Sequence, residues 1–65
     1  MDWSELMGQN GVAVTRLFPA GEARIAGNVI DVITDGRMVD KDEPIVVIEA
    51  IGNRVVVAPR NKKTS

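Results

Sequence analysis

The chain has 65 residues, a formal net charge of −1, and neither Cys nor His. Without these two residue types, disulfide frameworks, thiolate or imidazole metal sites and imidazole-activated nucleophiles lack their usual groups, and a domain this small rarely holds a deep catalytic cleft. Hydrophobic residues make up 45% of the chain but aromatic residues only 3%, a composition rich in Val, Ile and Ala that favours strands.

The first segment, residues 1–10, is predicted to be a linker or N-terminal extension. It can form one helical turn, with Ser4 as the cap and with Leu6 and Met7 packing, but such a turn is too short to be stable alone. The segment lacks the basic and apolar regions of a signal peptide. Apolar runs throughout the chain are shorter than the roughly 18 residues that span a bilayer, so we expect this chain itself to be soluble.

Short runs rich in Val and Ile follow, separated by turn residues, which is typical of an all-β unit. The predicted strands are residues 11–17, 22–26, 29–34, 44–51 and 54–58, within a barrel that covers residues 11–59. Pro19 and Gly21 predict a tight turn after the first strand. Gly27 predicts a bulge or a sharp bend after the second, and Gly52-Asn53 is a strong hairpin signal between the last two.

The longest connection covers residues 35–43 and contains four acidic residues: Asp35, Asp40, Asp42 and Glu43. Their spacing does not fit a calcium loop, so we interpret the connection as solvated rather than as a metal site. Met38 and Val39 are candidates to plug one end of the core. Residues 60–65 are polar and basic and are predicted to form a flexible tail.

Five short strands in so small a chain must hide their edges by closing on themselves. The predicted fold is therefore all-β, a small five-stranded antiparallel Greek-key barrel of the OB-fold type. An SH3-like barrel is the first alternative. A flattened barrel of the biotinyl type is the second, although such barrels usually contain more strands.

Side chains that alternate along a strand face opposite sides, so charged residues indicate the facing of their neighbours. Placing Arg16, Asp31, Glu49 and Arg54 in water gives the inward set Ala13, Thr15, Leu17, Ile30, Val32, Val46, Ile48, Ala50, Val55 and Val57. The outward set is then Val12, Val14, Val29, Ile33, Ile45, Val47, Ile51 and Val56.

This facing makes the outside of the barrel unusually apolar, whereas a small monomer rarely exposes a large contiguous apolar patch. We interpret the surplus as a contact surface for another protein, with Val12, Val14, Val47 and Val56 as candidate partner-binding residues. The alternatives are that a bulge shifts the facing of a strand by one residue, or that the N-terminal segment covers the patch.

The hairpin IVVIEAIGNRVVVAP, residues 45–59, resembles the hairpin on which biotinyl and lipoyl carrier domains present their modified lysine. Gly52 and Asn53 stand where that lysine and the following Met would lie. We therefore expect no cofactor, and attribute the likeness to the shared geometry of two Val-rich strands around a tight turn.

Binding of single-stranded nucleic acid is the alternative function, because OB-folds often bind single strands through a basic groove and aromatic stacking platforms. The aromatic residues here are Trp3 and Phe18, which both lie outside the predicted strands, and the arginines are spread among acidic residues. A protein partner is therefore favoured over nucleic acid. Neither Ser4 nor Ser65 has a His or a positioned Lys to activate it, and the Thr15 hydroxyl is expected to bond to the backbone, so we expect no catalytic residue.

The run GVAVTRLFPAGEARIAGNVIDVIT is the most distinctive part of the chain. It is similar to the pattern G-x-A-x-T-x-L-x-P-x-G-x-x-x-I/V-x-G of the C-terminal soluble domain of the NfeD family. The matching positions are Gly11, Ala13, Thr15, Leu17, Pro19, Gly21, Ile25 and Gly27. The similarity continues through residues 45–57 and departs at Asp42-Glu43-Pro44, where the family often has a Gly; Asp tolerates an unusual turn.

The resemblance implies an OB-fold barrel that follows membrane-spanning segments in intact family members, sometimes with a ClpP-like serine protease domain. It also implies a partnership with stomatin- and flotillin-type (SPFH) membrane proteins and an influence on membrane protease activity. We therefore expect a non-catalytic interaction module of a membrane-anchored protein that faces the cytoplasm. Self-association of the barrel is left open.

Overall fold

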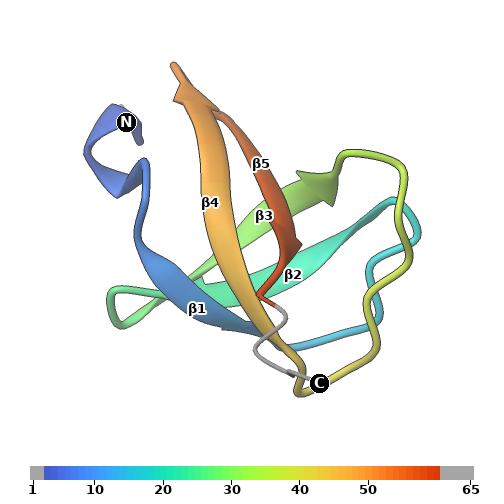
Figure 1. The fold of residues 1–65 in the computed structure, drawn as a ribbon. Helices are drawn as coiled ribbons and strands as arrows, with labels where there is room; N and C mark the ends of the chain where they lie inside the picture. The colour runs from blue at the N-terminus through green and yellow to red at the C-terminus, as the bar shows by residue number, and fades with distance from the viewer. Residues whose placement is uncertain (1–2, 61–65) are drawn as a thin grey trace.

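A computed structural model describes residues 3–60. They form a closed barrel with the strand order β1-β2-β3-β5-β4, preceded by a short 3-10 helix, η1 (Figure 1). The elements are η1 (Ser4–Leu6), β1 (Asn10–Ala13), β2 (Ala20–Ile25), β3 (Asn28–Thr34), β4 (Pro44–Ile51) and β5 (Arg54–Pro59). The predicted five-stranded OB-fold barrel is confirmed.

Pairing is antiparallel around the barrel except between β3 and β5, which are parallel. The antiparallel pairing that the sequence predicts therefore holds for four of the five neighbouring pairs. In a closed ring of five strands the directions cannot alternate all the way round, so one neighbouring pair must be parallel. The long loop after β3 carries the chain across to β4, which pairs with β1, and the β4–β5 hairpin then places β5 beside β3 (Figure 1).

The first strand is shorter than predicted, because β1 ends at Ala13 rather than at residue 17. The backbone N–H groups of Val14 and Thr15 both turn to the carbonyl oxygen of Glu22, at 2.8 and 3.3 Å. The Thr15 hydroxyl also accepts a hydrogen bond from the Glu22 N–H at 3.1 Å. Thr15 is therefore exposed at a turn instead of facing the core as predicted.

The core fills the barrel with aliphatic side chains from all five strands and the flanking segments. Its members are Leu6, Ala13, Leu17, Ala23, Ile25, Ile30, Val32, Val39, Ile45, Val47, Ala50, Val55 and Val57. Val39 is fully buried, as predicted for a plug residue, whereas Met38 is exposed. The predicted inward facing is confirmed for Ile30 and Val32 of β3.

The predicted facing is wrong for the first part of β4. The pairing between β4 and β5 shifts by one residue between Val47 and Glu49, which makes Ile48 the extra residue of a β-bulge. Val47 is consequently 1% exposed and part of the core, whereas Ile48 is 45% exposed. After the bulge the predicted facing holds, with Ala50 buried and Ile51 exposed.

Val56 corrects a second expectation. It alternates with the core residues Val55 and Val57, yet it is itself buried. Its strand has a neighbour on each side, and Val56 lies opposite Ile33 of β3 and Glu49 of β4. Side chains on a sheet pack against their cross-strand neighbours, which shield such a central position even on the outer face.

Residues 3–8 of the N-terminal segment contact the barrel. Leu6 belongs to the core and Trp3 packs against it. The Trp3 N–H donates to the Gly52 carbonyl oxygen, and the Gly8 N–H donates to that of Val47, both at 2.9 Å. Met7, which was expected to pack, is exposed.

The connection before β4 contains a non-glycine residue in the left-handed region, Asp42, with a φ of 71°. Its N–H donates to the Ala13 carbonyl oxygen at 2.8 Å, and the Ala13 N–H donates to the Glu43 carbonyl oxygen at 3.0 Å. Asp adopts this conformation more readily than most residues, which explains how the chain accommodates Asp where related sequences were expected to have Gly.

In the part of the chain that the structure describes, no helix has the length and apolar character needed to cross a membrane. The predicted basic tail, residues 60–65, lies outside the described residues apart from Arg60. The Arg60 N–H donates to the Pro44 carbonyl oxygen at 2.9 Å.

Candidate partner-binding surface

Two loops, residues 14–19 and 35–43, meet at one end of the barrel (Figure 1). They are joined by an antiparallel bridge in which the Leu17 N–H donates to the Val39 carbonyl oxygen at 2.8 Å and the Val39 N–H returns the bond at 3.0 Å. The side chains of Leu17 and Val39 are both fully buried. The two loops are therefore anchored in the core at this bridge.

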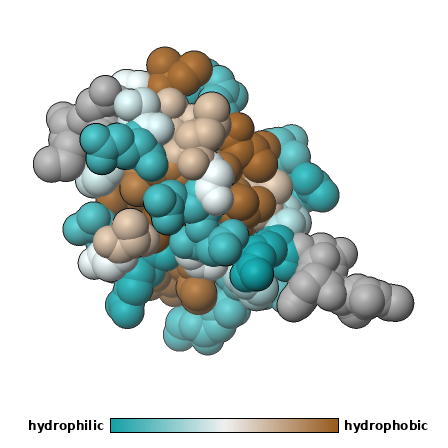
Figure 2. Space-filling model, turned by 60° about the vertical axis from the view of Figure 1, so that its left-hand side comes forward, coloured by the Kyte–Doolittle hydropathy of each residue, from teal (hydrophilic) through white to brown (hydrophobic). Residues whose placement is uncertain are grey.

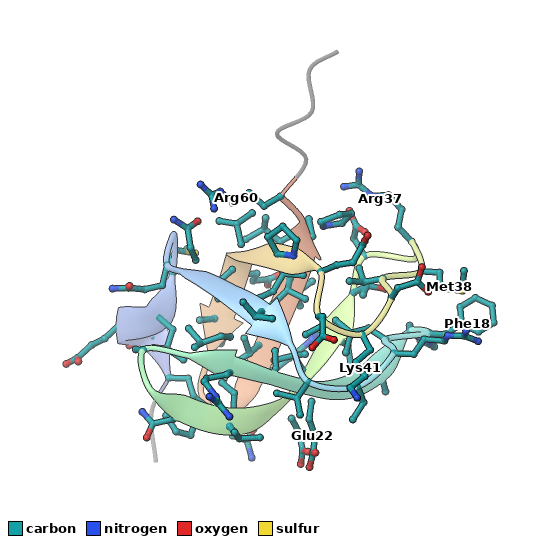
Figure 3. The ribbon with its side chains drawn as sticks, turned by 90° about the horizontal axis from the view of Figure 1, so that it is seen from below. Phe18, Glu22, Arg37, Met38, Lys41 and Arg60 are labelled. Carbon is teal, nitrogen blue, oxygen red and sulfur yellow. The ribbon has the colours of Figure 1, made fainter. Side chains whose placement is uncertain are left out.

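Phe18 directly follows Leu17 and Met38 directly precedes Val39, so both residues lie beside the bridge. Phe18 is 69% exposed and Met38 is 51% exposed. Figure 3 shows both side chains at the same end of the molecule, directed outward. We call Phe18 and Met38 together the loop tip.

Ion pairs flank the loop tip within the same two loops. Arg16 Nε lies 3.7 Å from Asp40 Oδ1, and Arg37 Nη2 donates to Asp35 Oδ2 at 2.9 Å. The hydrogen bond from Arg37 lowers the pKa of the Asp35 carboxyl, and the same bond raises the pKa of Arg37. Both pairs are solvent-exposed and contribute little to stability. They give the apolar tip a polar border, as protein interfaces have a polar rim.

Two of the four predicted partner-binding residues are accessible. Val12 is 43% exposed and Val14 is half-buried. They line a hollow with Arg24 and Lys41, and Val14 and Lys41 also line an adjoining hollow that reaches Arg16. The surface around Val12 and Val14 thus continues toward the loops that carry the tip.

Val47 and Val56 cannot be part of a surface, because both are buried, Val47 through the bulge and Val56 through its cross-strand neighbours. Conversely, the pattern of alternation missed Phe18 and Met38. Both lie outside strands, where alternation says nothing about facing, and Met38 was assigned to the core. The one available signal was that each is a large apolar residue within a loop.

Other exposed hydrophobic side chains are distributed over the barrel: Met7, Val29, Ile48 and Ile51. Figure 2 brings the side of η1 and β1 forward and shows hydrophobic residues in separate patches between hydrophilic ones. The outer surface is therefore less continuously apolar on this face than the sequence predicted, which leaves the loop tip as the better-defined candidate.

The remaining chemistry of the surface does not favour nucleic acid or metal. Glu22 of β2 lies directly opposite Asp31 of β3, and both side chains are exposed on the outer face of these strands. Two carboxylates there repel a phosphate backbone. Among the described residues, no group of three or more His, Cys, Asp or Glu side chains is placed to hold a metal ion.

Comparisons with known proteins point to a family of binding domains. The family described as "NfeD-like C-terminal, partner-binding domain" matches residues 4–59. Membrane protein NfeD1b of Bacillus subtilis (strain 168) is 37% identical over 54 residues. The match covers 83% of this chain but only 12% of NfeD1b, so the chain spans a small part of that relative.

Solved structures share the fold at lower identity. The C-terminal domain of stomatin operon partner protein 1510-C from Pyrococcus horikoshii has a TM-score of 0.83 at 24% identity, covering 89% of this chain and 92% of that domain. The soluble domain of a membrane protein implicated in regulation of membrane protease activity, from Corynebacterium glutamicum, has a TM-score of 0.79 at 17% identity, covering 88% and 95%. The soluble domain of the NfeD protein YuaF from Bacillus subtilis has a TM-score of 0.69 at 20% identity, covering 92% and 80%.

Proposed function

Because this chain belongs to the NfeD family, as a domain of its C-terminal, partner-binding type, we propose that it is a non-catalytic interaction module of a membrane-anchored protein. Its partner in this proposal is a stomatin- or flotillin-type (SPFH) membrane protein, and the complex modulates a membrane protease. Two relatives support the proposal: one is named a stomatin operon partner, and the other belongs to a membrane protein implicated in regulation of membrane protease activity.

The observation that carries the proposal is the loop tip. Phe18 and Met38 expose large apolar side chains from a backbone that is fixed to the core through Leu17 and Val39. Burying such a side chain in a partner contributes about 1.5–3 kcal/mol. Because the loops are held in place before binding, little additional ordering is required. Val12 of β1 and Val14, in the loop that follows, extend the same contact surface.

The direct test measures the affinity of the 65-residue chain for the soluble region of the stomatin-like protein from the same organism. The double variant Phe18→Ser, Met38→Ser removes the apolar anchor and should weaken binding at least about tenfold, since at least ~1.4 kcal/mol is lost. Ile51→Ser is the matched control, because Ile51 is 63% exposed and lies at the far end of β4. The control should bind within about twofold of the wild type.

Folding must be verified for each variant by circular dichroism before affinities are compared. If the double variant does not fold, Met38→Ser alone serves, because Met38 has no part in the core. Unchanged affinity in a folded tip variant would show that the partner binds elsewhere. Equal losses in the tip variant and in Ile51→Ser would show that the effect is not specific to the tip.

The membrane anchor and the cytoplasmic orientation belong to the same proposal and have their own test. The reading frame upstream should encode apolar spans of roughly 20 residues, each long enough to cross a bilayer. A reporter fused directly after this domain in the intact protein should then be active in the cytoplasm. Reporter activity only on the opposite side of the membrane would refute the orientation.

A further inference from the structure

Strand β3 has one edge that is only partly paired. On one side it pairs with β2 over its length, from Asn28 to Ile33. On the other side it pairs with β5 only at Ile33 and Thr34. Figure 1 shows β3 and β5 meeting near the end of β3 and running apart toward its beginning. Among the described residues, positions 29–32 therefore have no partner strand on the β5 side.

The hydrogen-bond pattern identifies which backbone groups face this open edge. The Thr34 N–H donates to the Pro19 carbonyl oxygen at 2.8 Å, in register with the β2–β3 pairing. Because hydrogen-bonded and non-hydrogen-bonded pairs alternate along an antiparallel ladder, Ile30 and Val32 direct their backbone groups to β2. Val29 and Asp31 consequently direct their N–H and C=O groups to the open edge.

A groove follows this edge. It is formed by two adjoining hollows that share Glu22, Asp31 and Asn53. One hollow extends to Arg54 and Val55 at the start of β5, and the other extends to Trp3. The edge is therefore accessible from solvent along its length, and the single Trp of the chain lies beside it.

Of the charged residues that line the groove, Glu22 and Asp31 are acidic and Arg54 is basic. Glu22 and Asp31 are directly opposed, in a non-hydrogen-bonded pair whose Cα atoms are typically about 4.5 Å apart. Like charges in that arrangement are destabilising. Neither carboxylate forms an ion pair within the described part of the chain, and Figure 3 shows Glu22 directed away from the barrel. A cation placed over the two carboxylates would relieve their repulsion.

We propose that the open edge of β3 binds an extended segment of a partner protein as an added strand, with a Lys or Arg side chain of that segment lying over Glu22 and Asp31. The backbone groups of Val29 and Asp31 supply the strand pairing, as in other complexes formed by β-strand addition. The cation fixes the register of the added strand. The site is separate from the loop tip and does not depend on which protein the tip contacts.

The test uses three synthetic peptides of alternating Val and Thr. The Lys peptide has one central Lys, and the Glu peptide has Glu in place of that Lys. The N-methylated peptide keeps the Lys but has alternate backbone amides methylated. Binding is followed through Trp3 fluorescence and through the backbone amide signals of the 15N-labelled chain. The Lys peptide should shift the signals of Val29 and Asp31. The Glu peptide should bind about tenfold more weakly, and N-methylation on the pairing edge should abolish binding.

A charge exchange sharpens the test. The double variant Glu22→Lys, Asp31→Lys should reverse the preference, so that the Glu peptide binds more tightly than the Lys peptide. The matched control is Glu43→Lys, an exposed position in the loop before β4, and it should keep the wild-type preference. The loop-tip variant Phe18→Ser, Met38→Ser should also keep the preference for the Lys peptide. Peptide binding thus tests the edge of β3 alone, and binding of the stomatin-like protein tests the loop tip, so the two proposals can fail independently.

Three results would overturn the proposal. Equal affinity for the Lys and Glu peptides would show that Glu22 and Asp31 do not recognise a cation. Full affinity of the N-methylated peptide would show that binding does not use backbone hydrogen bonds of an added strand. The free chain could also form a concentration-dependent dimer in sedimentation experiments, with loss of the backbone amide signals of Val29 and Asp31. That result would show that the edge of β3 pairs with a second copy of the chain instead of a partner protein.

Discussion

The bulge in β4 makes a quantitative prediction that separates two neighbouring residues. Val47→Thr keeps the shape of the side chain but places a hydroxyl at a position that is 1% exposed. Burying an uncompensated hydroxyl costs about 1–3 kcal/mol. Taking ~2 kcal/mol, and a Tm shift of about 4–8 °C per kcal/mol in a domain this small, the variant should melt roughly 8–16 °C below the wild type.

Ile48→Thr places the same residue type one position further along, where the side chain is 45% exposed. The hydroxyl can remain hydrated there, so we expect a loss of no more than about 1 kcal/mol and a Tm reduction below about 8 °C. Thr is favourable in strands at both positions. Thermal and urea unfolding followed by circular dichroism would measure both losses.

The reasoning would be refuted if Ile48→Thr were as destabilising as Val47→Thr. That result would mean that β4 alternates without interruption and that Ile48 faces the core. An unchanged slope of unfolding free energy against urea concentration is the internal control, because it shows that the compactness of the unfolded state has not changed.

Further predictions concern Gly21 of β2, Thr34 at the end of β3, and Asp35 in the loop that follows. Gly21→Ala should destabilise the chain by about 1–3 kcal/mol in urea unfolding, because an added Cβ would lie 2.6 Å from the backbone carbonyl oxygen of Arg16. Thr34→Val should lose about 1 kcal/mol, because the buried Thr34 hydroxyl accepts a hydrogen bond from the Gly36 N–H at 3.2 Å; no loss would refute that role. NMR titration should give Asp35 a pKa below its usual range, returning upward in Arg37→Gln. The ion pair between Asp35 and Arg37 stabilises the folded chain when the pH is above the usual Asp pKa. This stabilisation is lost as the pH falls through the lowered pKa of Asp35, and it should be small because the site is exposed.

The strands were largely predictable because their local signals agree. The fourth strand begins at Pro44 and ends before Gly52-Asn53, and both of its predicted ends match the structure. Gly52 has a φ of 60°, the conformation for which a Gly in a hairpin turn is suited. The first strand was overestimated because GVAVTRL continues to alternate after the backbone has turned toward Glu22.

The bulge could not be predicted, since residues 45–48 are all apolar and contain no polar residue to mark the facing. A single inserted residue exchanges the two faces of a strand. The inward and outward sides deduced from Glu49 are therefore wrong for the residues before the bulge and correct for those after it. The prediction for Val56 was wrong for another reason. Its burial depends on neighbours in β3 and β4, and the alternation of residues along β5 gives no information about those neighbours.

The candidate site was only half predictable. Val12 lies on a regular strand, and its exposure follows from alternation. The loop tip depends on a bridge between Leu17 and Val39, which are far apart in the sequence. Only the closed barrel brings their neighbours Phe18 and Met38 together. The family resemblance, by contrast, was already evident in the run from Gly11 to Gly27, and the match over residues 4–59 confirms it.

The most direct test of the proposed function is an NMR titration of the 15N-labelled chain with the soluble region of its stomatin-like partner. Backbone amide signals in the loops that carry Phe18 and Met38 should shift or broaden, followed by those of Val12 and Val14. Additional shifts at the edge of β3 would be compatible with a second contact. Shifts confined to surfaces away from the loops, or no shifts at partner concentrations that saturate binding in the affinity assay, would contradict the account.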